Sequence, residues 1–195
     1  MPFTESAHNR DFPLPVQNDQ TAEVPPGNSP ARFAGMSTQQ FSVPINERYF
    51  EDYIPGAIYE YGPIAVSEAD VIDFARKYDP QEIHTNPQKA AKGPFGGLIA
   101  SGWHTAGLMM RLFADNFISS VAAIASPGVD ELRWLKPVRP GDLLCIRVSV
   151  LEARRSQKKP DRGMIRAFIE VFNQHKEVVM TLKSMSLLLC RTIPK

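Results

Sequence analysis

The sequence contains no long hydrophobic run and no excess of charge of one sign. No stretch approaches the roughly 18 consecutive apolar residues that a membrane-spanning helix needs, and the first residues lack the apolar core of a secretory signal peptide. A cytoplasmic location is therefore predicted, with no membrane partner. The formal net charge of the 195 residues is only +1, which gives no reason to expect a nucleic-acid partner.

Cysteine is scarce. Cys145 and Cys190 each lie within an apolar run and do not share the short spacing of a metal site. Buried free thiols are the simplest interpretation, and a disulfide is the alternative. No second histidine is spaced to join Asp79, Glu82 and His84 as metal ligands, so no metal is predicted.

The composition otherwise fits one ordinary globular domain. Hydrophobic residues make up 43% and charged residues 22% of the chain. Residues 1–45 differ from the rest because they are rich in proline, asparagine, glutamine and serine and show no apolar periodicity. We predict a mobile or surface-draped extension over residues 1–45 and a single domain over residues 46–195. An organelle transit peptide is the alternative, but acids such as Glu5 and Asp11 are unusual in such a peptide.

A strand and a helix open the patterned part of the chain. Residues 57–66 alternate weakly between apolar and polar side chains, which predicts a strand. Ser67, followed three residues later by Asp70, is typical of a helix N-terminus, and apolar residues continue at helical spacing to Tyr78. The helix is therefore expected to begin at Ser67 and to end just before Asp79.

The segment after this helix gathers an acid, an imidazole and several polar side chains. Pro80 and Pro87 disfavour helical dihedrals in the residue before each of them, so residues 79–86 are predicted to form a loop in extended or turn geometry. Asp79 and His84 would point in different directions on a helix, whereas a folded-back loop can aim both at one point. Such a pair can carry general acid and base chemistry. The alternative is that Asp79 caps the helix and His84 is a surface residue.

A second helix is predicted over residues 98–114. Its side chains are apolar almost all the way round, which is typical of a helix buried on several sides. The polar residues Ser101, His104 and Thr105 lie in its first turns, so the N-terminal end is expected to be the polar end. Trp103 and His104 are interpreted as core residues.

The rest of the chain alternates with a period of two. This pattern predicts strands over residues 131–137, 144–150, 165–172 and 178–189. Turn signals such as Pro140-Gly141-Asp142 join consecutive strands, which favours an antiparallel meander. Because the long apolar helix has no other large element to pack against, the sheet is expected to curl around it in an α+β fold.

With this order of elements, the chain resembles the hotdog fold of the MaoC-like, (R)-specific enoyl-CoA hydratase family. Three stretches of the sequence carry the resemblance: DPQEIH at 79–84, GGLIASG at 96–102 and RWLKPVRPGD at 133–142. It covers about residues 50–191. The resemblance implies an antiparallel sheet wrapped around a long buried central helix.

The same resemblance implies an enzyme of fatty-acid metabolism that reversibly hydrates a 2-enoyl-CoA to a 3-hydroxyacyl-CoA. Asp79 and His84 align with the catalytic pair that activates water. Gly102, Ser101 and Gln81 are the expected oxyanion or substrate contacts. The Gly102 amide would lie at the positive end of the helix, and its missing side chain would let a thioester come close; helix packing is the alternative role for this glycine. No cofactor is expected, because coenzyme A is part of the substrate.

The motif also departs from the family pattern. Gln81 and Glu82 stand where asparagine and proline are usual, and Ser101 stands where many members have histidine. The glutamine amide can replace the asparagine amide with a longer reach, whereas Glu82 adds a charge near the site. Two other functions therefore stay open, a hotdog acyl-CoA thioesterase and a non-catalytic acyl-CoA binder.

A basic turn and the open sheet suggest further contacts. Arg154, Arg155 and Lys158 are candidates to bind the phosphates of coenzyme A, and a solvated hairpin tip is the alternative. In this family, paired protomers close the free edge and face of the sheet. A homodimer or a larger assembly of dimers is therefore expected.

Overall fold

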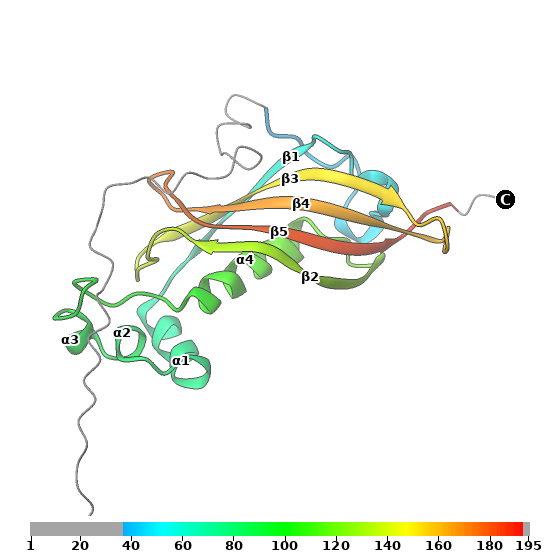
Figure 1. Ribbon diagram of the computed structural model, residues 1–195. Coiled ribbons are helices and arrows are strands. Elements are labelled where there is room, and N and C mark those ends of the chain that lie inside the picture. Colours follow the sequence, from blue (N-terminus) through cyan, green and yellow to red (C-terminus); the bar gives the residue numbers. More distant parts are fainter. Residues whose placement is uncertain (1–36, 193–195) are drawn as a thin grey trace, which may run out of the picture. The chain divides into compact units, whose positions relative to one another are not determined.

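The computed structural model describes residues 37–192, which form a five-stranded antiparallel sheet with one long helix along one face (Figure 1). The strands are β1 (Ile58–Ala65), β2 (Ala123–Trp134), β3 (Leu143–Arg155), β4 (Arg162–Phe172) and β5 (Val178–Leu189). Their order in the sheet is β1-β3-β4-β5-β2. The α+β class and the antiparallel pairing of consecutive strands β3, β4 and β5 are confirmed. The meander was wrong at its first step, because β2 pairs with β5 at the far edge and β1 takes the place beside β3.

The helices gather on one side of the sheet. They are α1 (Glu68–Tyr78), α2 (Glu82–Thr85), α3 (Pro87–Ala90) and α4 (Gly102–Asn116), preceded by the 3₁₀ turns Ile45–Glu47 and Phe50–Asp52. Figure 1 shows α4 lying along the sheet, with α1, α2 and α3 near the end at which α4 begins. None of the helices between residues 37 and 192 is both long and apolar enough to cross a membrane.

The hydrophobic core lies between α4 and the sheet. Alternate residues of the central strands, such as Ile146, Val148 and Ile169, are almost completely buried and share one cluster with Leu112 and Phe113 of α4. Burial of each side chain of this size stabilises the fold by about 1.5–3 kcal/mol. The period of two in the sequence therefore corresponds to the alternate side chains that face this core.

Helix α4 begins four residues later than the sequence predicts. The Ile99 N–H donates to the Ile83 carbonyl (3.2 Å), and the Ala100 N–H donates to the Val138 carbonyl (2.8 Å). Because these amides pair with other segments, residues 98–100 lie outside the helix, and the predicted start was wrong.

Helix α4 packs on the sheet as the central helix of the predicted fold, and the described chain buries one of its faces. This face includes Thr105, Leu112 and Phe113. On the opposite face, 59% of Trp103 and 48% of Met110 are exposed. A single sheet covers only one side of a helix, so this second apolar face has no cover within the described part of the chain.

The segment after α1 is only partly a loop. Asp79 ends α1 with φ −152° and ψ 68°, so the expected break is present. The following residues form the one-turn helices α2 and α3, which the sequence prediction missed. The Gln81 carbonyl accepts from both the N–H (3.1 Å) and the hydroxyl (3.1 Å) of Thr85, and these bonds stabilise the first of the two turns.

Most of the predicted N-terminal extension lies outside the described residues, so its mobility stays a prediction. Within its last residues, the ring of Phe41 stacks on Tyr59 with centroids 4.2 Å apart, and the Arg48 guanidinium lies 3.7 Å above the Phe41 ring. The Gln39 N–H also donates to the Ile58 carbonyl at 2.7 Å. The chain from about Gln39 onward therefore packs on β1.

Candidate active site

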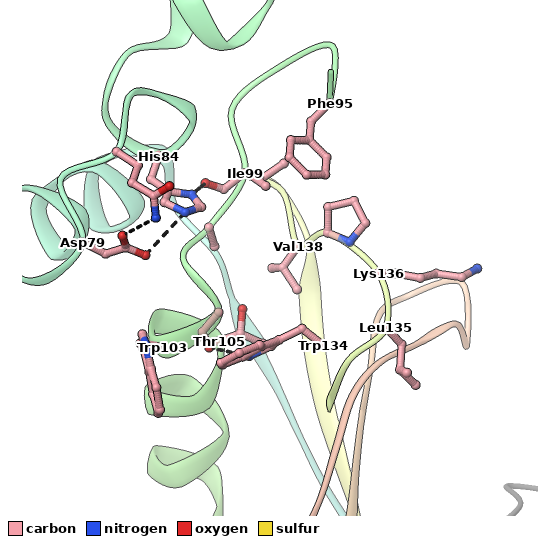
Figure 2. Close-up of a pocket in the computed structure, with 14 residues that line it drawn as sticks. Asp79, His84, Phe95, Ile99, Trp103, Thr105, Trp134, Leu135, Lys136 and Val138 are labelled. Carbon is pink, nitrogen blue, oxygen red and sulfur yellow. Dashed lines mark hydrogen bonds and ion pairs between the residues drawn. The ribbon is translucent and has the colours of Figure 1, made fainter. Parts of the chain in front are cut away.

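Asp79 and His84 point toward one another at the end of α1 (Figure 2). Asp79 is the C-cap of α1, and its N–H donates to the Ala75 carbonyl at 2.9 Å. His84 lies on α2 and is only 5% exposed. The distance from His84 Nε2 to Asp79 Oδ2 is 3.5 Å. The break at Asp79 followed by the turn of α2 thus brings the acid and the imidazole together.

Nε2 of His84 faces Asp79, and the hydrogen bond at Nδ1 determines which of the two nitrogens carries the proton. Nδ1 lies 2.9 Å from the Ile99 carbonyl, which can only accept, so Nδ1 carries the proton in the neutral ring. Nε2 then presents a lone pair toward Asp79 Oδ2, which is also an acceptor. Two acceptors 3.5 Å apart suit a small molecule that donates to both, such as water.

Two side chains orient the Asp79 carboxylate. The Gln81 amide donates to Oδ1 at 2.7 Å, and the Ser101 hydroxyl donates to Oδ2 at 2.7 Å. The bond from Gln81 and the bond from Ser101 hold the pKa of Asp79 below its ordinary value, so the carboxylate is ionised. The sequence predicts Gln81 and Ser101 as oxyanion or substrate contacts, whereas here both donate to Asp79.

Gly102 begins α4, and its backbone N–H meets no acceptor among the described residues. Such an amide at the positive end of a helix can stabilise a developing negative charge. A Cβ at Gly102 would lie 2.6 Å from Nε1 and 2.8 Å from Cδ2 of Trp134. The indole N–H also donates to the Gly102 carbonyl at 2.9 Å. The indole of Trp134 thus occupies the place of a side chain at Gly102, which favours the packing role as the reason for a glycine here, and its part in binding a thioester stays a prediction.

These residues line one pocket of about 450 Å³, called here the Asp79 pocket. Figure 2 shows Asp79 and His84 on one side, Trp103 and Trp134 at one end and Phe95 toward the other. The interpretation of Trp103 as a core residue was wrong, because its side chain is exposed and lines this pocket, and Trp134 and Phe95 were not among the predicted site residues. The stretch at 133–142, singled out as family-like, was the available signal for Trp134.

The basic turn does not reach this pocket. Arg154, Arg155 and Lys158 line a separate hollow at the β3–β4 turn, and Figure 1 shows that turn at the end of the sheet away from α1 and α2. Arg155 pairs with Glu51 at 2.7 Å and donates to two backbone carbonyls. Within one chain these cations are not part of the Asp79 pocket.

Other polar residues near the site have structural partners. Glu82 forms an exposed ion pair with Lys89. His104 is buried and stacks on Phe74 with centroids 4.9 Å apart, and burial lowers the pKa of its imidazole. It does not line the Asp79 pocket.

The described residues show no disulfide and no metal-binding cluster. Cys145 and Cys190 are free thiols. Within residues 37–192, no three histidine, cysteine or acidic side chains are grouped so that they could hold a metal ion.

Comparisons with known proteins agree with this fold. The model of the MaoC like domain family matches residues 52–166. The uncharacterized protein YdeM of Bacillus subtilis strain 168 is 30% identical over 141 residues, which cover 72% of this chain and 98% of that protein. The 3-hydroxybutyryl-CoA dehydratase of Methylorubrum extorquens is 35% identical over 105 residues, which cover 53% of this chain and 64% of the dehydratase.

Among solved structures, a MaoC-like dehydratase from Rhodospirillum rubrum matches with a TM-score of 0.69 and 33% identity. The match covers 74% of this chain and 99% of that chain.

Proposed function

Because the chain belongs to the MaoC-like dehydratase family of hotdog-fold proteins, we propose that it reversibly hydrates a 2-enoyl-CoA to a 3-hydroxyacyl-CoA. The observation that carries this proposal is the pair of acceptors, Asp79 Oδ2 and His84 Nε2, 3.5 Å apart in the wall of a pocket. Hydration of a conjugated thioester needs a base for water and a donor for the thioester oxygen. The pair and the Gly102 amide can fill these roles.

In the proposed reaction, a water molecule donates one hydrogen bond to Asp79 and one to His84. Asp79 accepts a proton as the water oxygen forms its bond to the β-carbon. The electron pair of the double bond moves toward the thioester carbonyl, whose oxygen gains negative charge and accepts from the Gly102 N–H. Asp79 then passes this proton to His84 Nε2, which delivers it to the α-carbon, so both side chains return to their starting protonation states. The sum is addition of one water, so no redox cofactor takes part.

Gln81 and Ser101 support this reaction through Asp79. Their hydrogen bonds fix the direction of both carboxylate oxygens and keep the group ionised. An ionised carboxylate with a low pKa is a weak base. It therefore passes the proton on readily, which suits a reaction that must run in both directions.

We also propose a homodimer. Strand β2 is an edge strand that pairs only with β5. Apolar residues on or beside it are 41–53% exposed: Val121, Ile124, Val129, Trp134 and Leu135. The uncovered apolar face of α4 lies next to this edge. A second copy paired edge to edge would satisfy the free backbone groups and bury these side chains.

The test follows loss of the enoyl thioester absorbance for the full-length protein with crotonyl-CoA and longer 2-enoyl-CoA substrates. A thiol reagent run in parallel reports free coenzyme A. Asp79→Asn is the test variant, and Asp73→Asn, an exposed site on α1, is the matched control. Absorbance loss without thiol release, abolished in Asp79→Asn and kept in Asp73→Asn, supports the hydratase.

The two other functions give different results in the same assay. Release of thiol would assign the protein to the acyl-CoA thioesterases. Binding of acyl-CoA with no turnover on any chain length, unchanged by Asp79→Asn, would identify a non-catalytic binder. Either result would overturn the proposed hydration.

A further inference from the structure

Two hollows lie one after the other along the seam between α4 and β2. The first is the Asp79 pocket, at the start of α4. The second is an apolar groove of about 250 Å³, called here the α4–β2 groove, whose walls include Met109, Met110, Ile124 and Val129. An apolar groove next to a thioester site has the right chemistry to hold an alkyl chain.

Trp134 lies at the boundary between these two hollows. The groove is lined on β2 by residues 123–129, and β2 ends at Trp134, beside the start of α4. The indole packs against Gly102, where it takes the place of a Cβ, and meets Trp103 edge-on with centroids 5.4 Å apart. Trp134 lines the Asp79 pocket but not the groove. The two tryptophans form one end of the Asp79 pocket (Figure 2), and Trp134 lies on the strand whose earlier residues line the groove.

The charge around the pocket indicates which end receives which part of the substrate. Lys136 is the only lysine or arginine among the described residues that line the Asp79 pocket, and its charge is paired with Glu177 at 2.6 Å. Nearby, the Arg139 guanidinium donates to the Phe95 carbonyl at 2.6 Å and is in no ion pair among the described residues. The anionic coenzyme is favoured at this cationic side, away from the tryptophans. The acyl chain then points toward Trp134.

We infer that Trp134 closes the acyl end of the Asp79 pocket and restricts the substrate to short-chain 2-enoyl thioesters. This inference rests on the proposed hydration. The indole is held by its hydrogen bond to the Gly102 carbonyl and by Trp103, so a longer chain cannot displace it without breaking both contacts. Removal of the indole would join the pocket to the α4–β2 groove, and the second copy in the proposed dimer would shield that groove from water.

The experiment measures kcat/KM of the full-length protein for 2-enoyl-CoA substrates of four, six, eight and ten carbons. The variants are Trp134→Ala, Trp134→Phe and Trp134→Ala combined with Met110→Trp, which narrows the groove. The readout is the ratio of the ten-carbon to the four-carbon value within each variant, because this ratio is independent of any general loss of activity.

Wild type should prefer the four-carbon substrate by about 100-fold or more, since each extra methylene that cannot be accommodated is worth about tenfold or more. Trp134→Ala should raise the ratio of ten-carbon to four-carbon kcat/KM at least about tenfold, and Trp134→Phe should raise it less. Adding Met110→Trp to Trp134→Ala should return the ratio toward the wild-type value.

Equal use of four- and ten-carbon substrates by wild type would overturn the inference and leave the proposed hydration intact. So would an unchanged ratio in Trp134→Ala, or a gain that Met110→Trp does not reverse. No turnover at any chain length would overturn the proposed hydration and the inference with it. If Trp134→Ala does not fold, the chain-length profile of wild type and the ratio of ten-carbon to four-carbon kcat/KM in Trp134→Phe still test the inference.

Discussion

The Ser101 hydroxyl donates a 2.7 Å hydrogen bond to Asp79 Oδ2 across 22 positions of sequence. The Ser101 hydroxyl oxygen also accepts from the Trp103 N–H at 3.2 Å and so caps α4. One side chain thereby ties the start of α4, where Gly102 presents its amide, to the end of α1, where Asp79 lies. The proposed base and the proposed oxyanion donor are held in register by this hydroxyl.

Ser101→Ala should shift the acid limb of the pH–rate profile to higher pH. The bond from Ser101 favours ionised Asp79, so its loss raises the pKa of the carboxyl and protonates the proposed base at a higher pH. We expect activity at neutral pH to fall about tenfold, since a hydrogen bond to a charged group is worth about 1.5–3 kcal/mol. The profile of kcat/KM against pH is the measurement. Ser120→Ala, at an exposed serine, serves as control, and an unmoved limb would contradict the assignment.

The contribution of Asp79 to the free energy of unfolding should decrease as the pH is lowered. A carboxyl whose folded-state pKa is lowered stabilises the fold above its ordinary value of 3.8, and this contribution is lost as the pH falls through the folded-state pKa. The difference in free energy of unfolding between wild type and Ser101→Ala should therefore narrow below about pH 4. Urea unfolding at pH 7 and at pH 3.5 measures it, and a difference that widens on acidification would refute the lowered pKa.

Gly102→Ala should destabilise the protein by about 1–3 kcal/mol, because the new methyl group meets the indole of Trp134. Gly107→Ala on the same helix is the matched control. Its Cβ would meet nothing within 4 Å, so it should stabilise α4 by about 0.5–1 kcal/mol. Chemical unfolding followed by circular dichroism measures both. Equal effects of the two substitutions would contradict the packing of Trp134 on Gly102.

Glu170→Gln should stabilise the protein at neutral pH. Glu170 is fully buried, its Oε1 has no partner among the described residues, and burial raises the pKa of its carboxyl although Arg147 opposes the rise. The stability that such a group confers is present below its ordinary pKa and is lost as the pH rises through the folded-state pKa. At pH 7 we expect a gain of about 1 kcal/mol, which raises Tm by about 2–4 °C.

Calorimetry at pH 7 and pH 4 tests this expectation, because the gain should shrink at the lower pH. Glu60→Gln is the control, since it removes the 2.6 Å ion pair of Arg147 with Glu60 and should lower Tm instead. A lower Tm in Glu170→Gln at pH 7 would show that the charge of Glu170 is stabilising.

Val129→Asp should convert the proposed dimer to a monomer. Val129 lies on the edge strand β2 and is 53% exposed, so a buried charge at a dimer interface there is unfavourable. Light scattering after gel filtration gives the mass. Ile54→Asp, at an equally exposed apolar residue outside the sheet, should leave the mass unchanged. A monomeric wild type would exclude edge pairing at the concentration measured.

The sequence by itself determined the elements whose signals are local. Ser67 caps α1 through the Asp70 N–H at 3.1 Å, α1 ends at Tyr78, and β5 spans the predicted residues 178–189. These features depend on dihedral preferences and on side chains a few residues apart, which a single segment reveals. The convergence of Asp79 and His84, five residues apart, follows from the same kind of local pattern. The order of strands does not, because β2 pairs with β5 and not with β3, which follows it in the chain.

Only the tertiary structure decided which side chains meet across the fold. The packing of Trp134 on Gly102 depends on how β2 lies against α4, and the pairing of Arg155 with Glu51 joins residues 104 positions apart. The uncovered face of α4 likewise reflects the width of one sheet, which the apolar character of the helix does not reveal. Such contacts depend on strand register and on packing between distant segments, and no local pattern encodes them.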